Sequence, residues 1–182
     1  MQRWRVPLGF FVAALFIVLA RPRPLTLILG GAVAVCGLLV RAWASGHIRK
    51  NAALAVSGPY AYTRNPLYLG TFILGIGFTV AAAGGWLLFF LLGGIFAALF
   101  LGIYLPVMRV EALTLAQLFG KDYERYAAGV PLLFPRLTPY GGGDGRGLKF
   151  DMDLYLRYRE YRAALGLLAG LSVLALKAFL VK

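Results

Sequence analysis

Long runs of apolar residues divide this chain and restrict it to the helical membrane proteins. Five such runs occur, at residues 6–20, 25–44, 67–83, 86–107 and 163–181. A helix rises about 1.5 Å per residue, so about 20 apolar residues are needed to cross a hydrocarbon core of about 30 Å. Because 60% of the 182 residues are hydrophobic, an ordinary water-soluble domain is excluded. We therefore predict an all-α, polytopic membrane protein with about five transmembrane helices.

The first apolar run permits a second interpretation. Arginines at positions 3 and 5 precede a short apolar stretch, which is also the pattern of a cleaved signal peptide. The sequence Arg-Pro-Arg-Pro at 21–24 instead favours a tight turn leading straight into the next helix. We therefore expect residues 6–20 and 25–44 to form a helical hairpin rather than a signal peptide followed by a helix.

The distribution of basic residues predicts how the chain lies in the membrane. The formal net charge is +12, from 19 Lys and Arg against 7 Asp and Glu. If all five runs span, the segments 41–65 and 109–162 lie on one side with the N-terminus, and that side holds most of the cations. Loops rich in Lys and Arg face the cytoplasm. We predict a multi-pass protein with its basic loops on the cytoplasmic side, in contact with anionic lipids rather than with nucleic acid.

A dense polar and aromatic segment lies between two apolar runs at residues 58–70. It reads Gly-Pro-Tyr-Ala-Tyr-Thr-Arg-Asn-Pro-Leu-Tyr-Leu-Gly. Proline suits the first turn of a helix, and asparagine is a good N-cap, so the third helix is predicted to begin at Asn65 or Pro66. A simple turn does not need so many polar side chains. We interpret the segment as a ligand-binding elbow at the membrane surface.

A second polar segment follows the fourth apolar run, whose end we expect near Pro106. Residues 111–119 have helical spacing, Gly120 is a plausible stop, and residues 130–136 place two prolines around apolar residues, which favours an extended strap. Because Gly84 and Gly85 are predicted to turn the third helix back on the fourth, Arg64 is expected to approach Glu111.

An arginine, a glutamate and several tyrosines at one helix end can recognise a zwitterionic ligand. Arginine binds a carboxylate through two hydrogen bonds, and tyrosine rings attract an onium centre. The alternative is structural: Arg64 lies at the interface, and Glu111 pairs with Arg109 or Lys121 on the surface.

The two segments together resemble a known signature. Gly-Pro-Tyr-x-Tyr-x-Arg-Asn-Pro-x-Tyr-x-Gly at 58–70, followed by Glu-x-x-x-Leu-x-x-x-Phe-Gly-x-x-Tyr-x-x-Tyr at 111–126, is similar to the integral-membrane methyltransferases typified by isoprenylcysteine carboxyl methyltransferase and the phospholipid N-methyltransferases. The resemblance extends to Arg136. It departs from the family at Asn65, where a histidine is usual, and at Ala112, where a second glutamate is usual.

The resemblance implies an S-adenosylmethionine-dependent methyltransferase with a cytoplasm-facing cofactor pocket and a lipophilic acceptor, such as an isoprenylcysteine carboxylate or a lipid amine. It assigns catalysis to Arg64, Asn65 and Glu111. The cofactor-binding residues that it implies are Tyr60, Arg64, Asn65, Pro66, Tyr68, Gly70, Glu111, Tyr123, Tyr126 and Arg136. The alternative from another class is a non-catalytic membrane scaffold, or a small carrier, that binds lipid headgroups.

The rest of the chain supplies secondary predictions. We divide it into a core at 1–136, a Gly-rich linker at 137–149 and a C-terminal unit at 150–182, formed by an amphipathic segment and a transmembrane helix. Gly166 and Gly170 have a spacing that would allow a homodimer. The only histidine, His47, is expected at the surface, and no metal site is predicted.

Overall fold

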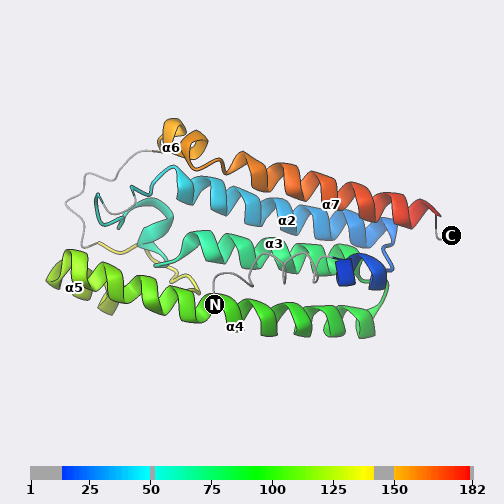
Figure 1. Cartoon of the computed structure of the whole chain (residues 1–182), viewed down its shortest axis with the longest axis horizontal. Helices are drawn as coiled ribbons and strands as arrows, with labels where there is room; N and C mark the ends of the chain where they lie inside the picture. The colour runs from blue at the N-terminus through cyan, green and yellow to red at the C-terminus, as the bar shows by residue number, and fades with distance from the viewer. Residues whose placement is uncertain (1–13, 50–51, 142–149, 181–182) are drawn as a thin grey trace.

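The computed structural model describes residues 14–49, 52–141 and 150–180, which are helical with irregular connections and contain no strand (Figure 1). Residues 14–19 are helical, and the chain turns at 20–23 into α2. The elements that follow are α2 (Pro24–Ser45), the 3-10 helix η2 (Gly58–Ala61), α3 (Pro66–Ala82), α4 (Trp86–Phe119), α5 (Lys121–Gly129), α6 (Met152–Arg157) and α7 (Tyr161–Leu180).

Helices α2 and α3 form the closest pair in the molecule. Small residues recur on α2 at Gly30, Ala34 and Gly37, and they face Gly77 and the neighbouring turns of α3. A Cβ added at Gly37 would lie 2.6 Å from the carbonyl oxygen of Gly70. The two backbones therefore touch, which is how transmembrane helices associate when lipid removes the hydrophobic drive between them.

Helix α4 is longer than the sequence predicted. It runs without a break from Trp86 to Phe119, so the expected end near Pro106 is wrong and the separate helix at 111–119 is its continuation. A proline removes one backbone hydrogen bond but does not end a helix that lies in an apolar setting. The predicted stop at Gly120 is confirmed, because this residue caps α4 with a φ of 51°.

The C-terminal helices return along the α2–α3 pair. Arg159, with a φ of 54°, separates α6 from α7, so the predicted amphipathic segment is broken. Helix α7 packs against α2 and α3. A Cβ at Gly170 would overlap the ring of Phe78, so this glycine already serves a contact inside the chain, whereas Gly166 faces open space. A homodimer through the two glycines remains a prediction.

Three helices of the described residues are long and apolar enough to cross a membrane, namely α2, α4 and α7. Helix α3 is apolar but has only 17 residues. Most of the first predicted run, and Gly142 to Lys149 of the predicted linker, lie outside the described residues. The structure thus supports an all-helical membrane protein, and the number of five spans is not confirmed.

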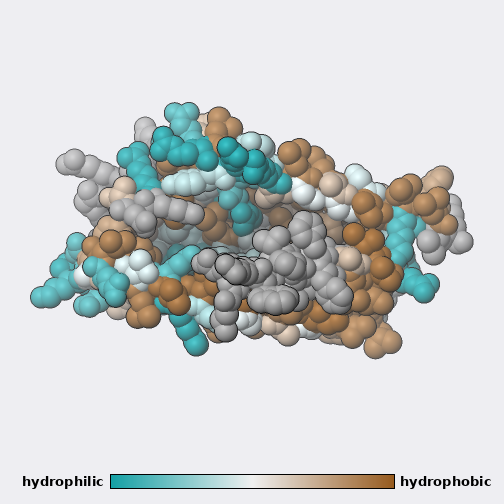
Figure 2. Space-filling model, viewed as in Figure 1, coloured by the Kyte–Doolittle hydropathy of each residue, from teal (hydrophilic) through white to brown (hydrophobic). Residues whose placement is uncertain are grey.

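Apolar and polar surfaces are segregated along the molecule. Large hydrophobic side chains are exposed along α2, α4 and α7, as expected for surfaces that meet lipid. Figure 2 shows hydrophilic residues gathered at the end that carries α5 and α6, with a smaller hydrophilic group at the opposite end. We call the first the polar end: it contains residues 41–49, 52–65, 109–140 and 150–160 (Figure 1).

Candidate functional site

The polar end is built by two segments that are distant in the sequence. The elbow, residues 58–70, and the strap, residues 130–136, are joined by backbone hydrogen bonds from Arg64 N to Pro131 O (2.9 Å) and from Arg136 N to Tyr62 O (3.0 Å). A third bond, from Tyr140 N to Ala61 O (2.9 Å), continues the contact beyond the strap. The hydroxyl of Thr63 adds a buried bond of 2.8 Å to the carbonyl of Leu133. The strap is non-helical, as predicted.

Asn65 is the N-cap of α3, as predicted, but its side chain does not cap the helix. Its Nδ2 instead donates a hydrogen bond of 2.9 Å to the carbonyl of Leu132 in the strap. Pro66 is buried at the first position of α3, where its missing N–H costs nothing. Gly70 permits the contact with α2, because a Cβ there would lie 2.6 Å from Cγ of Arg41. These three residues therefore hold helices and strap in place.

Tyr60 and Tyr126 form the buried centre of the site. The hydroxyl of Tyr126 donates a hydrogen bond of 2.7 Å to the carbonyl of Tyr60. Burial raises the pKa of both phenols above the ordinary value near 10. Among the described residues, the hydroxyl of Tyr60 has no hydrogen-bond partner. Both phenols therefore stay neutral across the physiological range.

Arg64 is the cation of the site. Its Nη1 lies 3.4 Å from the hydroxyl of Tyr123, a long and weak contact. Its Nε is buried and has no partner in the part of the chain that the structure describes. No carboxylate of the described residues forms an ion pair with it. Burial raises the pKa of Tyr126 and the charge of Arg64 acts in the opposite direction, so the guanidinium lies near that ring.

Glu111 is the anion of the site and reaches it from α4. The hydroxyl of Tyr68 donates a hydrogen bond of 2.9 Å to Oε1 of Glu111. The ring of Tyr68 also contacts that of Tyr104, with centroids 5.3 Å apart. The negative charge of Glu111 contributes to the raised pKa of Tyr60. Arg64 and Glu111 thus lie at the same end of the molecule, around the Tyr60–Tyr126 pair, without a salt bridge between them among the described residues.

Arg136 takes no part in this grouping. Its guanidinium donates to the carbonyl of Gly129 (2.7 Å) and to the hydroxyl of Thr138 (3.3 Å), so it clamps the end of α5 to the strap. His47 is 6% exposed, and the expected surface position is wrong. Its Nδ1 lies 2.8 Å from the carbonyl of Trp43, and its ring lies edge-on to Phe150.

Sequence reasoning missed an ionic cluster beside the elbow. Arg41 of α2 binds both carboxylate oxygens of Glu160 at 2.8–3.1 Å and donates from Nη1 to the hydroxyl of Thr71 at 2.5 Å. The sequence contains an indication of this cluster, because Arg41 is the only charged residue inside the apolar run 25–44. A charge in an apolar helix needs a partner.

The arrangement joins a cation, a carboxylate and aromatic rings at the border between apolar helices and polar surface. Such a set can hold a phosphate on the guanidinium and an amine on the carboxylate and the rings. Among the described residues, no group of three or more His, Cys, Asp and Glu is placed to hold a metal ion.

Comparison with known proteins finds relatives named for metal resistance. The chain is 33% identical over 148 residues to the cobalt-zinc-cadmium resistance protein CzcN of Cupriavidus metallidurans, a match that covers 76% of this chain and 65% of that protein. It is 33% identical over 102 residues to the nickel-cobalt-cadmium resistance protein NccN of Alcaligenes xylosoxydans xylosoxydans, a match that covers 54% of this chain and 44% of that protein. The chain thus spans less than two thirds of either relative.

No family model matches the chain, and no solved structure matches it. The names of the relatives overturn the predicted membership in the methyltransferase family, and with it the predicted enzyme and the predicted S-adenosylmethionine cofactor. The structure gives a physical reason for the misleading resemblance. Pro66, Gly70 and Arg136 match the signature, and each makes a contact that holds the fold. What the chain resembles over most of its length is a protein named for resistance to cobalt, zinc and cadmium.

Proposed function

We propose that the chain is a non-catalytic membrane scaffold whose polar end holds zwitterionic lipid headgroups, and that it serves in resistance to divalent transition metals. The metal part of the proposal rests on the names of the relatives. The lipid part rests on one observation: Arg64 is a half-buried cation that forms no ion pair with a carboxylate of the described residues.

The chemistry of the site suits a headgroup with both charges. The guanidinium of Arg64 provides several donors for a phosphate. Glu111 provides a carboxylate for the amine, and Tyr68 and Tyr104 provide aromatic faces beside it. Arg64 and Glu111 lie at the polar end, and Tyr68 and Tyr104 lie next to it on α3 and α4. A phospholipid whose tails lie on those helices would bring its headgroup to this level.

Electrostatics favour an indirect part in metal resistance. The chain carries a net charge of +12, which repels divalent cations and attracts anionic groups. We therefore assign its contribution to the membrane and its lipids rather than to capture of the metal ion.

The spans favour a scaffold over a small carrier. Carriers place ionisable groups near the middle of the bilayer. Here α3 contains no Asp, Glu, Lys, Arg or His, and α4 contains none before Arg109. The cytoplasmic position of the polar end is part of the same proposal, and it is supported by the excess of Lys and Arg there.

Two measurements on Arg64→Gln test the proposal. Native mass spectrometry of the detergent-purified protein should show about tenfold weaker retention of phosphatidylethanolamine than the wild type, or about 1.4 kcal/mol. Expression of the wild type in a metal-sensitive bacterial host should raise the tolerated concentration of Co²⁺, Zn²⁺ or Cd²⁺, and the variant should lose this gain.

The matched control is Lys121→Gln, which removes an exposed cation on α5 and should change neither readout. Wild-type protein that reaches the membrane without raising metal tolerance would refute the role in resistance. Equal lipid retention by Arg64→Gln and the wild type would refute the headgroup site.

A further inference from the structure

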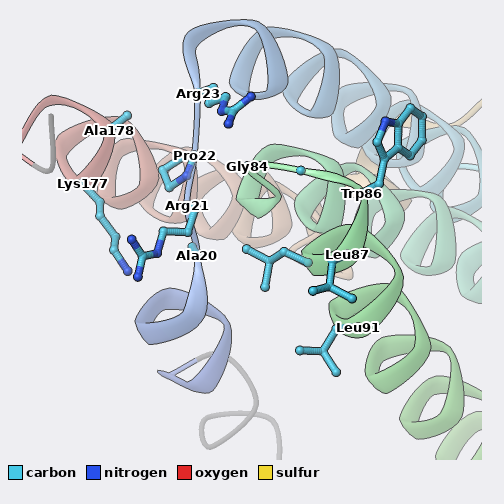
Figure 3. Close-up of a pocket in the computed structure, with 12 residues that line it drawn as sticks. Ala20, Arg21, Pro22, Arg23, Gly84, Trp86, Leu87, Leu91, Lys177 and Ala178 are labelled. Atoms are coloured by element: carbon cyan, nitrogen blue, oxygen red, sulfur yellow. The ribbon is translucent and has the colours of Figure 1, made fainter.

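A cavity of about 660 Å³ lies at the end of the molecule opposite to the polar end (Figure 3). It is formed where the turn at 20–23, the α3–α4 turn, the start of α4 and the end of α7 meet. Its charged lining consists of three cations, Arg21, Arg23 and Lys177, and its apolar lining includes Leu87, Leu88 and Leu91. This volume is in the range of small-molecule sites in proteins.

Hydrogen bonds fix the walls of this cavity. The backbone N–H of Arg21 donates to the carbonyl of Ala82 at 2.8 Å, which joins the first turn to the end of α3. The ammonium of Lys177 donates to the carbonyls of Ile17 (2.6 Å) and Val18 (2.8 Å). Figure 3 shows the side chains of Lys177 and Arg21 pointing toward one another. Two positive charges are therefore held together by the fold.

Among the residues that the structure describes, no side-chain carboxylate lines this cavity to neutralise them. All seven Asp and Glu lie between Glu111 and Glu160, in the segments that build the polar end and in the connection to α6. The described residues that line the cavity are 20–23, 84–88, 91 and 177–178. Like charges that face one another without a counterion raise the free energy of the folded protein, and a bound anion would lower it.

We propose that this cavity binds the phosphate headgroup of an anionic phospholipid in the leaflet opposite to the polar end. The cations would hold the phosphate, and the leucines of α4 would lie along the upper part of an acyl chain. Trp86, 80% exposed at the start of α4, is the residue type that favours the level of the headgroups. The site is separate from that of Arg64 and does not depend on the proposed function.

The double variant Arg21→Gln/Arg23→Gln tests the proposal, because it keeps the bonds that Lys177 makes to the backbone. In native mass spectrometry, the variant should retain phosphatidylglycerol about tenfold more weakly than the wild type. Retention of phosphatidylcholine should not change. The matched control is Lys121→Gln/Arg125→Gln, which removes two exposed cations at the polar end and should leave phosphatidylglycerol retention unaltered.

A second arm distinguishes a lipid from a free anion. Millimolar inorganic phosphate added to the wild type should fail to displace phosphatidylglycerol, because it lacks the acyl chains. Full displacement by phosphate would overturn the assignment to a lipid. Undiminished retention by the Arg21/Arg23 variant, or equal loss in the control, would overturn the site itself. Because phosphatidylethanolamine retention at Arg64 is measured separately, a failure here is distinguishable from a failure of the proposed function.

Discussion

Arg41 and Glu160, separated by 119 positions in the sequence, form a two-pronged ion pair that joins α2 to the start of α7. The side chains are 22% and 12% exposed, so the pair is largely withdrawn from solvent. Arg41 also donates to the carbonyl of Leu67 and the hydroxyl of Thr71 on α3. One guanidinium thus connects α2, the first turns of α3 and the residue that precedes α7.

Loss of either partner of this pair should destabilise the protein. Removing one charge leaves the other buried without compensation, and for fully buried pairs this costs about 3–5 kcal/mol. Allowing for the residual exposure, we expect Glu160→Gln to lower the free energy of unfolding by about 2 kcal/mol. Denaturant titration of the detergent-solubilised protein measures this change. The control Asp122→Asn breaks a pair that is 3.8 Å long and more than 70% exposed, and it should cost less than about 0.5 kcal/mol.

The α2–α3 contact predicts that one methyl group is enough to separate two helices. In Gly77→Ala, the new Cβ would overlap the backbone of Ala34 and lie 2.6 Å from the carbonyl of Gly30. Such overpacking typically costs about 1–3 kcal/mol. The control is Gly102→Ala on α4, where nothing lies within 4 Å of the added Cβ. Equal unfolding midpoints for the two variants would contradict the close approach of the helices.

Local backbone chemistry explains which elements could be predicted from the sequence. The start of α3 after Asn65, the stop at Gly120 and the turn at Gly84 and Gly85 depend on single residues and their neighbours, and all three positions are confirmed, although the side chain of Asn65 does not cap the helix. Continuation of α4 through Pro106 could not be predicted in this way, because the surroundings of the helix decide it.

The site was harder to predict because its contacts are long-range. That Arg64 and Glu111 share one end follows from the helical hairpin, and the structure places them there. The partners of Asn65 and Arg41 could not be foreseen, because they lie 67 and 119 positions away. The resemblance misled because polar residues that bind a strap and residues that bind a ligand are of the same types.

The bond from Asn65 to the strap predicts a local change in dynamics. Asn65→Asp replaces the Nδ2 donor by an acceptor that faces the carbonyl of Leu132, a loss of about 1–3 kcal/mol. Hydrogen exchange should therefore accelerate about tenfold or more at the N–H groups of Arg64 and Arg136, which bridge elbow and strap. Thr114→Val, which removes an exposed bond within α4, should leave these two rates unchanged. If the N–H groups of Arg64 and Arg136 exchange as slowly in Asn65→Asp as in the wild type, the hydrogen bond from Asn65 to Leu132 does not hold the strap.

The buried tyrosines predict a loss of stability at alkaline pH. The pKa values of Tyr60 and Tyr126 are raised in the folded state, so below about pH 10 both states hold these protons and stability does not change. Above about pH 10 the unfolded chain loses protons that the folded chain keeps, and stability falls by up to about 1.4 kcal/mol per pH unit for each tyrosine.

Tyr126→Phe should roughly halve this dependence on pH, and it should cost about 1 kcal/mol at neutral pH because the bond to Tyr60 is lost. Tyr60→Phe should reduce the dependence equally but stabilise the protein at neutral pH, since it removes a buried hydroxyl without a described partner. Unfolding titrations between about pH 9 and pH 11 separate the two variants, and an alkaline dependence that neither variant reduces would show that other groups cause it.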